Sequence, residues 1–231
     1  GSRIKRTGFD SSQPIAVVTA QQMNDLGYTN IADALNKMPA FGTPGSDGQG
    51  DQAGNNVGSN YANFYGLGSQ RTLVLVNGRR FVSGNPAANG TGAAGLQVDL
   101  NMIPLSMVDR IEVVSVGGAP TYGSDAIAGV INFRLENSAN ANRIEIRTGQ
   151  YYEGDGARFE LSGISGTKIG ESGSANFSFE YSESEATSRG IQDPAVQSLI
   201  DSGISKDDIQ DPVVIWGAPE ITNNIKTLLD I

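Results

Sequence analysis

Apolar and polar residues alternate in two different ways along the chain. Up to residue 136, apolar residues come in short runs or at helical spacing, separated by polar and Gly-rich stretches. Three later segments, RIEIRT, ARFELSG and ANFSFEYSE, alternate strictly between apolar and polar positions. Strict alternation is typical of a strand whose two faces meet different surroundings. The pattern therefore predicts a small mixed α+β unit followed by antiparallel amphipathic strands.

The first part of the mixed unit, residues 14–41, predicts a strand followed by two short helices. PIAVVTA is a short apolar run bounded by a turn signal. Ile31, Leu35 and Met38 fall on one face of a helix, and Pro39 ends that helix. We interpret this stripe as a face that packs on the core.

The clearest hairpin is RTLVLVNGRRFV, residues 71–82. Its Asn77-Gly78 pair readily supplies the two positive φ angles of a type I′ turn. The LVLV segment is apolar on both faces, so it predicts a central strand. Further on, IPLSMVDRIEVV and YGSDAIAGVINFRL predict helical turns and two more strands, residues 110–116 and 129–135.

The alternating strands have two interpretations. One face carries Phe177, Phe179 and Tyr181, while the other carries Ser178 and Glu180. In a soluble sheet the apolar face would pack on a core, whereas in an outer-membrane barrel it would face lipid. Alternation alone favours neither, although strands of about ten residues joined by turns are typical of barrels.

Residues 188–231 predict a long polar loop rather than further strands. The alternation stops after Glu185, and two helical patterns follow, around 194–201 and 219–231. Three amphipathic strands leave two unpaired edges and cannot close a barrel. We therefore expect the chain to stop inside this loop, with more of the protein beyond it.

Composition excludes several function classes. The formal charge is −9, with 16 Lys and Arg residues, which argues against a nucleic-acid surface. The chain has no Cys and no His, so it lacks the usual thiol nucleophile, general base and metal ligand. Hence we expect no enzyme and no cofactor, and partners that are neutral or cationic.

Two weak chemical signals in the sequence do not indicate a functional site. Asp47 and Asp51 lie among Gly and Asn residues, but the spacing and terminal Glu of an EF-hand are missing. Ser124 is followed by Asp125, but without a His or Lys base in register we interpret this pair as a helix cap. The sequence predicts neither a metal site nor a catalytic residue.

These segments together resemble a known family. YTNIADALNKMPAF, NFYGLGSQRTLVLVNGRRFV, IPLSMVDRIEVV and YGSDAIAGVINF occur in the order found in TonB-dependent outer-membrane receptors. The resemblance implies a plug domain at residues 1–136, the first three strands of a transmembrane β-barrel at 137–187, and a long extracellular loop at 188–231. The N-terminus would be periplasmic and the plug would lie inside the barrel.

The resemblance also implies partners and a function. Such receptors fill a barrel of about 22 strands with the plug. They take up a scarce solute, such as a metal chelate, an oligosaccharide or a peptide, when TonB pulls on an N-terminal box. We expect that box before Gly1, the rest of the barrel after Ile231, and outer-membrane lipid around the strands. Two alternatives remain: a signalling receptor of the same architecture, and a soluble β-rich carbohydrate-binding or hydrolytic module.

Candidate site residues follow from the resemblance. Residues expected at the solute-binding apex of the plug combine aromatic rings with amides: Tyr61, Asn63, Phe64, Tyr65, Asn85 and Asn89. Residues expected to contact the barrel, or to link plug strands, are charged: Arg79, Arg80, Arg110 and Glu112. Two positions depart from the family pattern, because Tyr65 and Ser115 stand where the family usually has a cation. A standard ion pair between plug and barrel is therefore in doubt at these positions.

Overall fold

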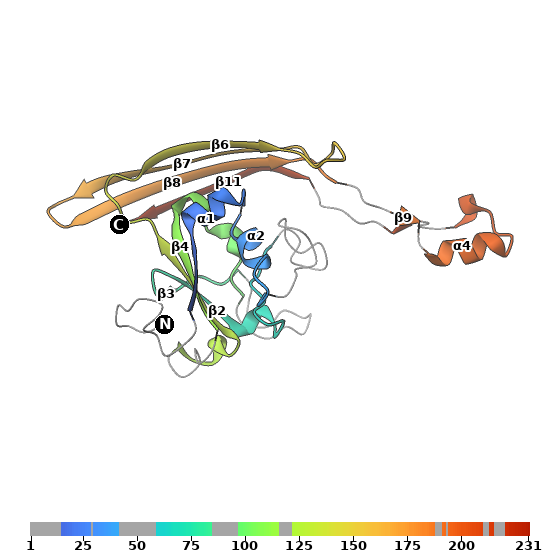
Figure 1. Cartoon of the computed structure of the whole chain (residues 1–231), viewed down its shortest axis with the longest axis horizontal. Helices are drawn as coiled ribbons and strands as arrows, with labels where there is room; N and C mark the ends of the chain where they lie inside the picture. Colours follow the sequence, from blue (N-terminus) through green and yellow to red (C-terminus); the bar gives the residue numbers. More distant parts are fainter. Residues whose placement is uncertain are drawn as a thin grey trace.

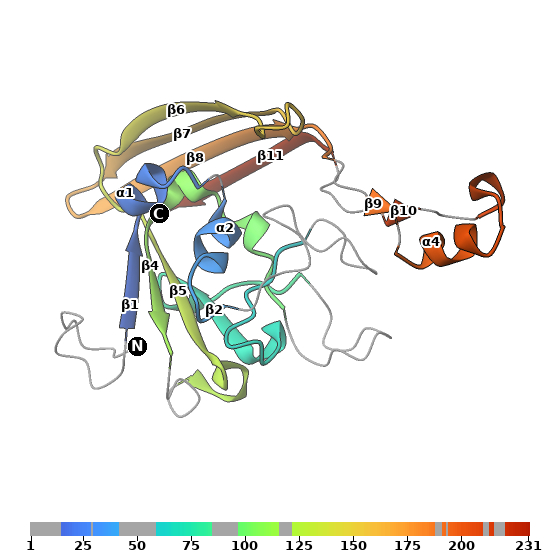
Figure 2. The same cartoon turned by 45° about the vertical axis from the view of Figure 1, so that its right-hand side comes forward.

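The structure consists of a mixed unit that lies against one long, curved sheet (Figures 1 and 2). It is a computed structural model that describes residues 15–28, 30–41, 59–84, 97–115, 122–187, 191–192, 194–209, 213–214 and 220–231. We use "mixed unit" for the described residues up to 136 and "curved sheet" for the four strands β6, β7, β8 and β11. No helix among the described residues is long and apolar enough to cross a membrane.

The mixed unit is built on a five-stranded sheet with the order β1-β4-β5-β2-β3. Its strands, in that order, are Ile15–Thr19, Val108–Val114, Gly129–Leu135, Thr72–Val76 and Arg79–Arg80. Strands β2 and β5 run parallel, whereas the other neighbours are antiparallel. The central place predicted for LVLV is confirmed, because β2 lies between β5 and β3 with four of its five residues buried.

The predicted hairpin turn is confirmed by its backbone. Asn77 has φ 49° and Gly78 has φ 79°, the two positive angles of a type I′ turn. The Asn77 side-chain oxygen also accepts a hydrogen bond from the Leu135 amide at 3.0 Å. The turn therefore fixes the end of the neighbouring strand β5.

Short helices cover the sheet as the N-terminal pattern predicts. Helix α1 spans Ala20–Asp25 and α2 spans Ile31–Asn36. Thr19 begins α1 with a capping box, in which its hydroxyl and the Gln22 side chain each bond the other's backbone. The remaining short 3₁₀ turns of the unit are η3 Ser69–Arg71, η4 Leu100–Met102, η5 Leu105–Met107 and η6 Ser124–Ala126.

The core lies between these helices and the sheet. Ile31 and Leu35 of α2 are each 1% exposed, which confirms the predicted packing stripe. They join Met107, Ile111 and Phe133 in one cluster of buried apolar side chains. Burial of this apolar surface is the main force that holds the mixed unit together.

The curved sheet contains four antiparallel strands in the order β11-β8-β7-β6. They are Ile221–Asp230, Gly173–Ser184, Arg158–Ile169 and Asn142–Gly149. The three predicted amphipathic strands are confirmed. The helix expected at 219–231 is wrong, because β11 pairs along β8 from Ser184 to Asn176. Pairing with a partner strand overrides the weak helical pattern of this short segment.

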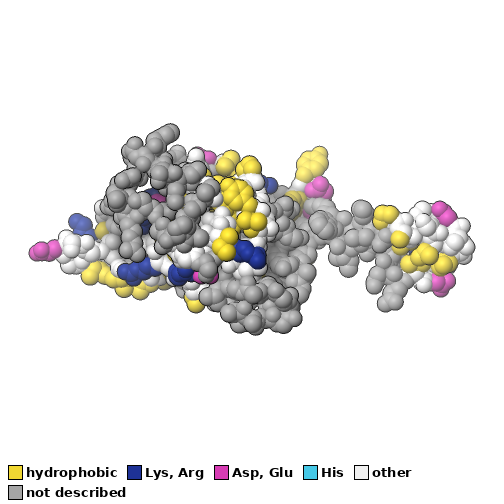
Figure 3. Space-filling view, turned by 90° about the horizontal axis from the view of Figure 1, so that it is seen from below, with side chains coloured by type: hydrophobic (Ala, Val, Ile, Leu, Met, Phe, Trp, Pro, Cys, Tyr) yellow, Lys and Arg dark blue, Asp and Glu magenta, His cyan; other side chains and the backbone are white. Residues whose placement is uncertain are grey.

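A segment between β8 and β11 leaves the curved sheet. Within it β9, Ile191–Gln192, pairs with β10, Val213–Val214. Helix α4, Pro194–Asp201, confirms the helix predicted there, and the 3₁₀ turn η7 spans Lys206–Asp208. Figure 3 shows apolar side chains beside acidic ones on this segment.

Candidate functional site: the contact between the mixed unit and the curved sheet

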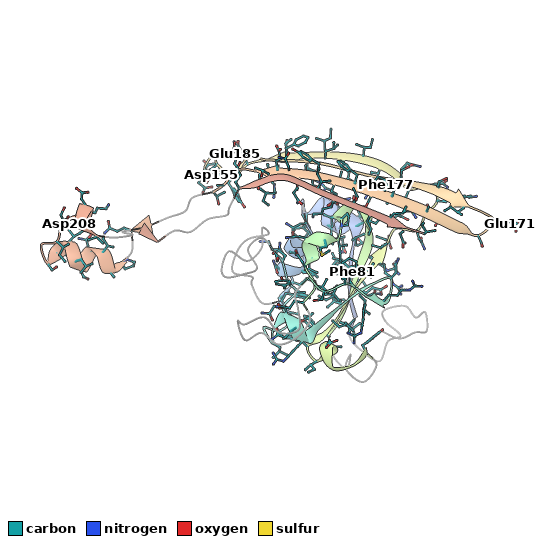
Figure 4. All side chains as sticks on the ribbon, turned by 180° about the vertical axis from the view of Figure 1, so that it is seen from behind. Phe81, Asp155, Glu171, Phe177, Glu185 and Asp208 are labelled. Atoms are coloured by element: carbon teal, nitrogen blue, oxygen red, sulfur yellow. The ribbon has the colours of Figure 1, made fainter. Side chains whose placement is uncertain are left out.

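The curved sheet exposes its apolar face. Ile144 is 80% exposed, and Ile146, Phe177, Ile225 and Leu229 are also largely exposed. The strand register places these residues on one face of the sheet, opposite the face that carries Glu160 and Glu180, and Figure 4 labels Phe177 among them. A continuous apolar surface of this kind is unusual on a protein that meets only water.

The opposite face is polar and covered by the mixed unit. Glu160, Asn176, Ser178 and Glu180 are each less than 9% exposed. The polar positions of the alternating pattern are therefore inside and the apolar positions outside. This polarity is the reverse of that of a soluble sheet packed on a core.

Charges on the covered face neutralise one another within the curved sheet. Arg143 pairs with Glu145 at 2.5 Å, and Arg147 pairs with both Glu145 and Glu160, the latter at 3.0 Å. Two strands away, the Glu180 carboxylate lies 3.6 Å from the Lys226 ammonium, whose side chain is 12% exposed. The sheet thus carries a ladder of alternating charges under the mixed unit.

The backbone of turn η5 in the mixed unit forms hydrogen bonds with two of these charged side chains. The Ser106 amide donates to Glu180 Oε1 at 2.7 Å. The Ser106 carbonyl accepts a hydrogen bond from Arg143 at 3.2 Å. One residue of the mixed unit therefore engages a carboxylate and a guanidinium at once.

Two amide side chains make the other polar contacts between the two parts. In α1, Asn24 Oδ1 accepts a hydrogen bond from Arg147 at 2.7 Å. At the hairpin turn, Asn77 Nδ2 donates to Asp230 Oδ2 of β11 at 3.2 Å. In each case the mixed unit supplies a neutral group and the curved sheet supplies a charged one.

A small apolar contact accompanies these hydrogen bonds. Ile164 of β7 is 5% exposed and belongs to the core cluster of the mixed unit, and Leu228 of β11 packs against that cluster. A small cavity of about 10 Å³ lies beside Ser106. The interface therefore combines apolar packing with four hydrogen bonds to charged groups.

Of the predicted contact residues, Arg80 links parts of the mixed unit. Its guanidinium forms an ion pair with Asp125 and donates to the Tyr122 carbonyl at 2.6 Å. Asp125 is thus an ion-pair partner, and η6 begins after Gly123 without a side-chain cap, so the predicted Ser124-Asp125 cap is wrong. Arg79 is exposed.

Arg110 and Glu112 also pair inside the five-stranded sheet. Arg110 donates to Asp109 at 2.6 Å and to Glu112 at 3.1 Å. Glu112 accepts further hydrogen bonds from Asn132 at 2.8 Å and from Arg134 at 3.3 Å. Burial lowers the pKa of Arg110, but the Asp109 hydrogen bond and the two carboxylate charges outweigh it, so the pKa is raised. Glu112 thus links β4 to β5, while the predicted contact of these residues with a barrel wall stays a prediction.

The predicted solute-binding residues have unequal access to solvent. Tyr65 is 53% exposed at φ 54°, and Tyr61 forms a backbone bridge to Asp99. Asn63 uses its side-chain oxygen to accept a hydrogen bond from the Gly68 amide at 2.8 Å. The predicted residues Asn85 and Asn89, like Asp47 and Asp51, lie outside the described residues.

Phe64 is a correction to the predicted solute site. It is 1% exposed, and its ring packs on Phe41 with centroids 4.8 Å apart. A Cβ atom at Gly129, where φ is +156°, would lie 2.6 Å from the same ring. A ring so enclosed has no surface for a solute, so Phe64 supports the loop from the core instead.

The sequence did not single out Asn24, Ser106, Asn77 or Asp230 as contact residues. Each is a small polar residue in a turn, a short helix or a strand end, where polar residues are common for local reasons. Glu180 and Arg147 did carry a signal, because they fall on the polar face of alternating strands. Their position opposite the mixed unit is visible only in the fold.

Curated relatives are similar to this chain in sequence. The vitamin B12 transporter BtuB of Vibrio cholerae is 31% identical over 175 residues, which are 76% of this chain and 26% of that protein. The probable TonB-dependent siderophore receptor PirA of Acinetobacter baumannii is 31% identical over 140 residues, 59% of this chain and 18% of that protein. The chain thus spans about a quarter or less of the length of these relatives, which are transporters and receptors.

Solved structures agree with the fold. The siderophore receptor PirA from Acinetobacter baumannii has a TM-score of 0.59 at 25% identity, covering 74% of this chain and 24% of that one. The ferric enterobactin receptor PfeA from Pseudomonas aeruginosa has a TM-score of 0.58 at 22% identity, covering 74% and 25%. The second likeness supports the fold alone.

A family model identifies the mixed unit. The model described as "TonB-dependent Receptor Plug Domain" matches residues 7–130, more than half of the chain. The matched range contains four strands of the five-stranded sheet and the first two residues of β5. This chain therefore belongs to the TonB-dependent receptor plug domain family.

Proposed function

We propose that the chain is the plug and the first wall strands of a receptor that takes up a scarce solute across the bacterial outer membrane in a TonB-dependent way. Residues 1–136 are the plug in this proposal, and the barrel wall begins at 137. The proposed loop after the third wall strand then covers about residues 188–220, since β11 is a fourth strand. The plug lies inside the barrel with a periplasmic N-terminus.

The reversed polarity of the curved sheet carries this proposal. Its polar face is buried against the mixed unit, while Ile144, Ile146 and Phe177 are exposed on the other side. Such an arrangement is unfavourable in water but favourable when hydrocarbon surrounds the sheet. Lipid on one side and a polar lumen filled by the plug on the other match both faces.

The proposed partners are TonB, the remaining barrel strands, outer-membrane lipid and a small extracellular solute. The names of BtuB and PirA make metal chelates the first solutes to test, ahead of oligosaccharides and peptides. We assign solute contact to Tyr61, Asn63 and Tyr65, together with Asn85 and Asn89. Of the four charged residues, Arg79 is the best placed for a contact with the rest of the wall, because it is exposed and the other three form ion pairs within the mixed unit.

The test is uptake by cells that carry the intact receptor. Radiolabelled iron chelates, cobalamin, oligosaccharides and peptides are offered to matched strains with and without TonB. We expect one solute class to accumulate only in the presence of TonB. Tyr65→Ala should lower that uptake, while Arg71→Ala, a matched change at an exposed neighbour, should leave it near the original rate.

Two results would contradict the proposal. The first is that none of the solutes accumulates in a TonB-dependent way. The other is extraction of the native protein from cells by salt or buffer without detergent, which would indicate a soluble module. A receptor that binds a solute but only alters transcription would instead identify the signalling alternative.

A further inference from the structure

We propose that this part of the barrel wall holds the plug through neutral plug groups bonded to charged wall groups, so that the plug can leave without stranding a charge. The positioning residues are Asn24 and Ser106 on the plug side, and Arg147 and Glu180 on the wall side. The inference rests on the proposed function only in taking the mixed unit as a plug that moves relative to the wall.

Arg147 keeps its charge balanced whether or not the plug is docked. Its guanidinium contacts Asn24 Oδ1 at 2.7 Å, but it also pairs with Glu145 and Glu160 of the curved sheet. When α1 leaves, Arg147 loses one neutral acceptor and retains two carboxylates. A guanidinium has five N–H donors, so these bonds do not compete.

Glu180, which is negatively charged, also keeps an ion pair when the plug leaves. Its Oε1 accepts from the Ser106 amide at 2.7 Å, while Oε2 faces Lys226 at 3.6 Å. Release of η5 therefore removes a backbone hydrogen bond and leaves the ion pair. Arg143 repeats the pattern, because it gives up the Ser106 carbonyl and keeps Glu145.

The charged residues of the plug form their ion pairs within the plug. Among the described residues, ion pairs join plug to plug or wall to wall, as with Arg80–Asp125 and Arg110–Glu112 in the mixed unit. Breaking a buried ion pair by withdrawing one partner leaves an uncompensated charge, which is strongly unfavourable. A hydrogen bond between a neutral and a charged group is favourable but much easier to exchange for water.

The plug side of this attachment is built from backbone and amide groups. Four such bonds, together with Ile164 and Leu228 against the core cluster, hold the plug in register. The wall presents charges, but it does not require a charged partner.

The test measures docking directly in the intact receptor. This chain has no Cys, so Gln21→Cys places a spin label on the exposed side of α1. The label's mobility in outer-membrane vesicles, followed through a urea series, gives the ratio of undocked to docked plug. Neither solute nor TonB is needed, so a receptor that fails every uptake assay still reports on docking.

Glu180 provides a matched pair of variants. Glu180→Ala removes the acceptor of the Ser106 amide, and we expect the undocked-to-docked ratio to rise about tenfold. Glu180→Gln keeps a side-chain oxygen in place of the charge, so the ratio should rise less than about threefold. Equal losses in the two variants would overturn the proposal, because the charge rather than the acceptor would then be holding the plug.

Asn24 tests the same idea from the plug side. Asn24→Ala should raise the ratio about fivefold to tenfold by removing the neutral acceptor of Arg147. Asn24→Asp keeps an oxygen there and adds a charge, so docking should be retained or tightened. A ratio unchanged by Asn24→Ala, or raised as much by Asn24→Asp, would contradict a role for this contact.

Discussion

The most deeply buried side chains of the five-stranded sheet include Ile111, Ile131 and Phe133, whereas those of the curved sheet include Asn176 and Ser178. The two sheets lie in one chain and touch, yet they bury opposite kinds of residue. The first is stabilised by apolar packing against its own helices. The second has its polar face covered by η5 and α1 of the mixed unit and leaves its apolar face outward, which suits lipid. Alternation therefore marks two faces of a strand without saying which face is inside.

The largest expected effect comes from a mutation in the apolar core of the mixed unit. Phe133→Ala empties a core position that is 0% exposed, and we expect it to lower the free energy of unfolding by about 3–5 kcal/mol. Urea unfolding of the plug in the intact receptor, followed by its susceptibility to protease, measures the loss. Phe177→Ala on the exposed face of β8 is the control and should change this transition far less. Similar losses in both would mean that the two phenylalanines share one kind of environment.

The next effect tests the outward face of the curved sheet. Phe177→Arg places a charge where we propose hydrocarbon, and a charge near the middle of a bilayer destabilises a barrel by about 2–4 kcal/mol. The fraction of receptor that is folded in the outer membrane, read from heat-modifiable gel migration, should fall. Phe177→Leu keeps an apolar side chain and should leave that fraction near the original value. A folded fraction unaffected by the arginine would argue against lipid at this position.

The smallest expected effect concerns the buried polar face of the curved sheet. Ser178 is 0% exposed, and its hydroxyl has no hydrogen-bond partner among the residues that the structure describes. Because no bond is lost, Ser178→Ala should change the free energy of unfolding by less than about 1 kcal/mol. Ser178→Leu overfills the same site and should destabilise by about 1–3 kcal/mol. Paired urea curves on the two variants measure this difference, and a large loss with alanine would reveal a hydrogen bond to the hydroxyl.

Local signals in the sequence predicted much of the fold. The Asn77-Gly78 turn needs only two residues with positive φ, and the stripe of Ile31 and Leu35 needs only helical spacing. Strand β11 was missed because a short apolar and polar run fits either a helix or a strand, and its pairing with β8 decides between them. Phe64 was misjudged because an aromatic ring beside a loop can point to solvent or into the core.

The candidate site was less predictable than the fold. Arg80, Arg110 and Glu112 stood out as charges beside apolar strands, and they do pair within the mixed unit. The contacts with the curved sheet come instead from Asn24, Ser106 and Asn77, whose partners are 37 to 153 positions away in the chain. Separation on this scale leaves no local pattern to read.

By itself, the sequence determined most of the elements and the two faces of β6, β7 and β8, because side-chain period and turn chemistry act over a few residues. It also determined the family resemblance, through the order of its plug segments. Only the tertiary structure decided which face of the curved sheet is buried and which neutral groups meet which charges. Burial is a property of what lies opposite a surface, and what lies opposite the polar face of β7 and β8 comes from α1 and η5, far earlier in the chain.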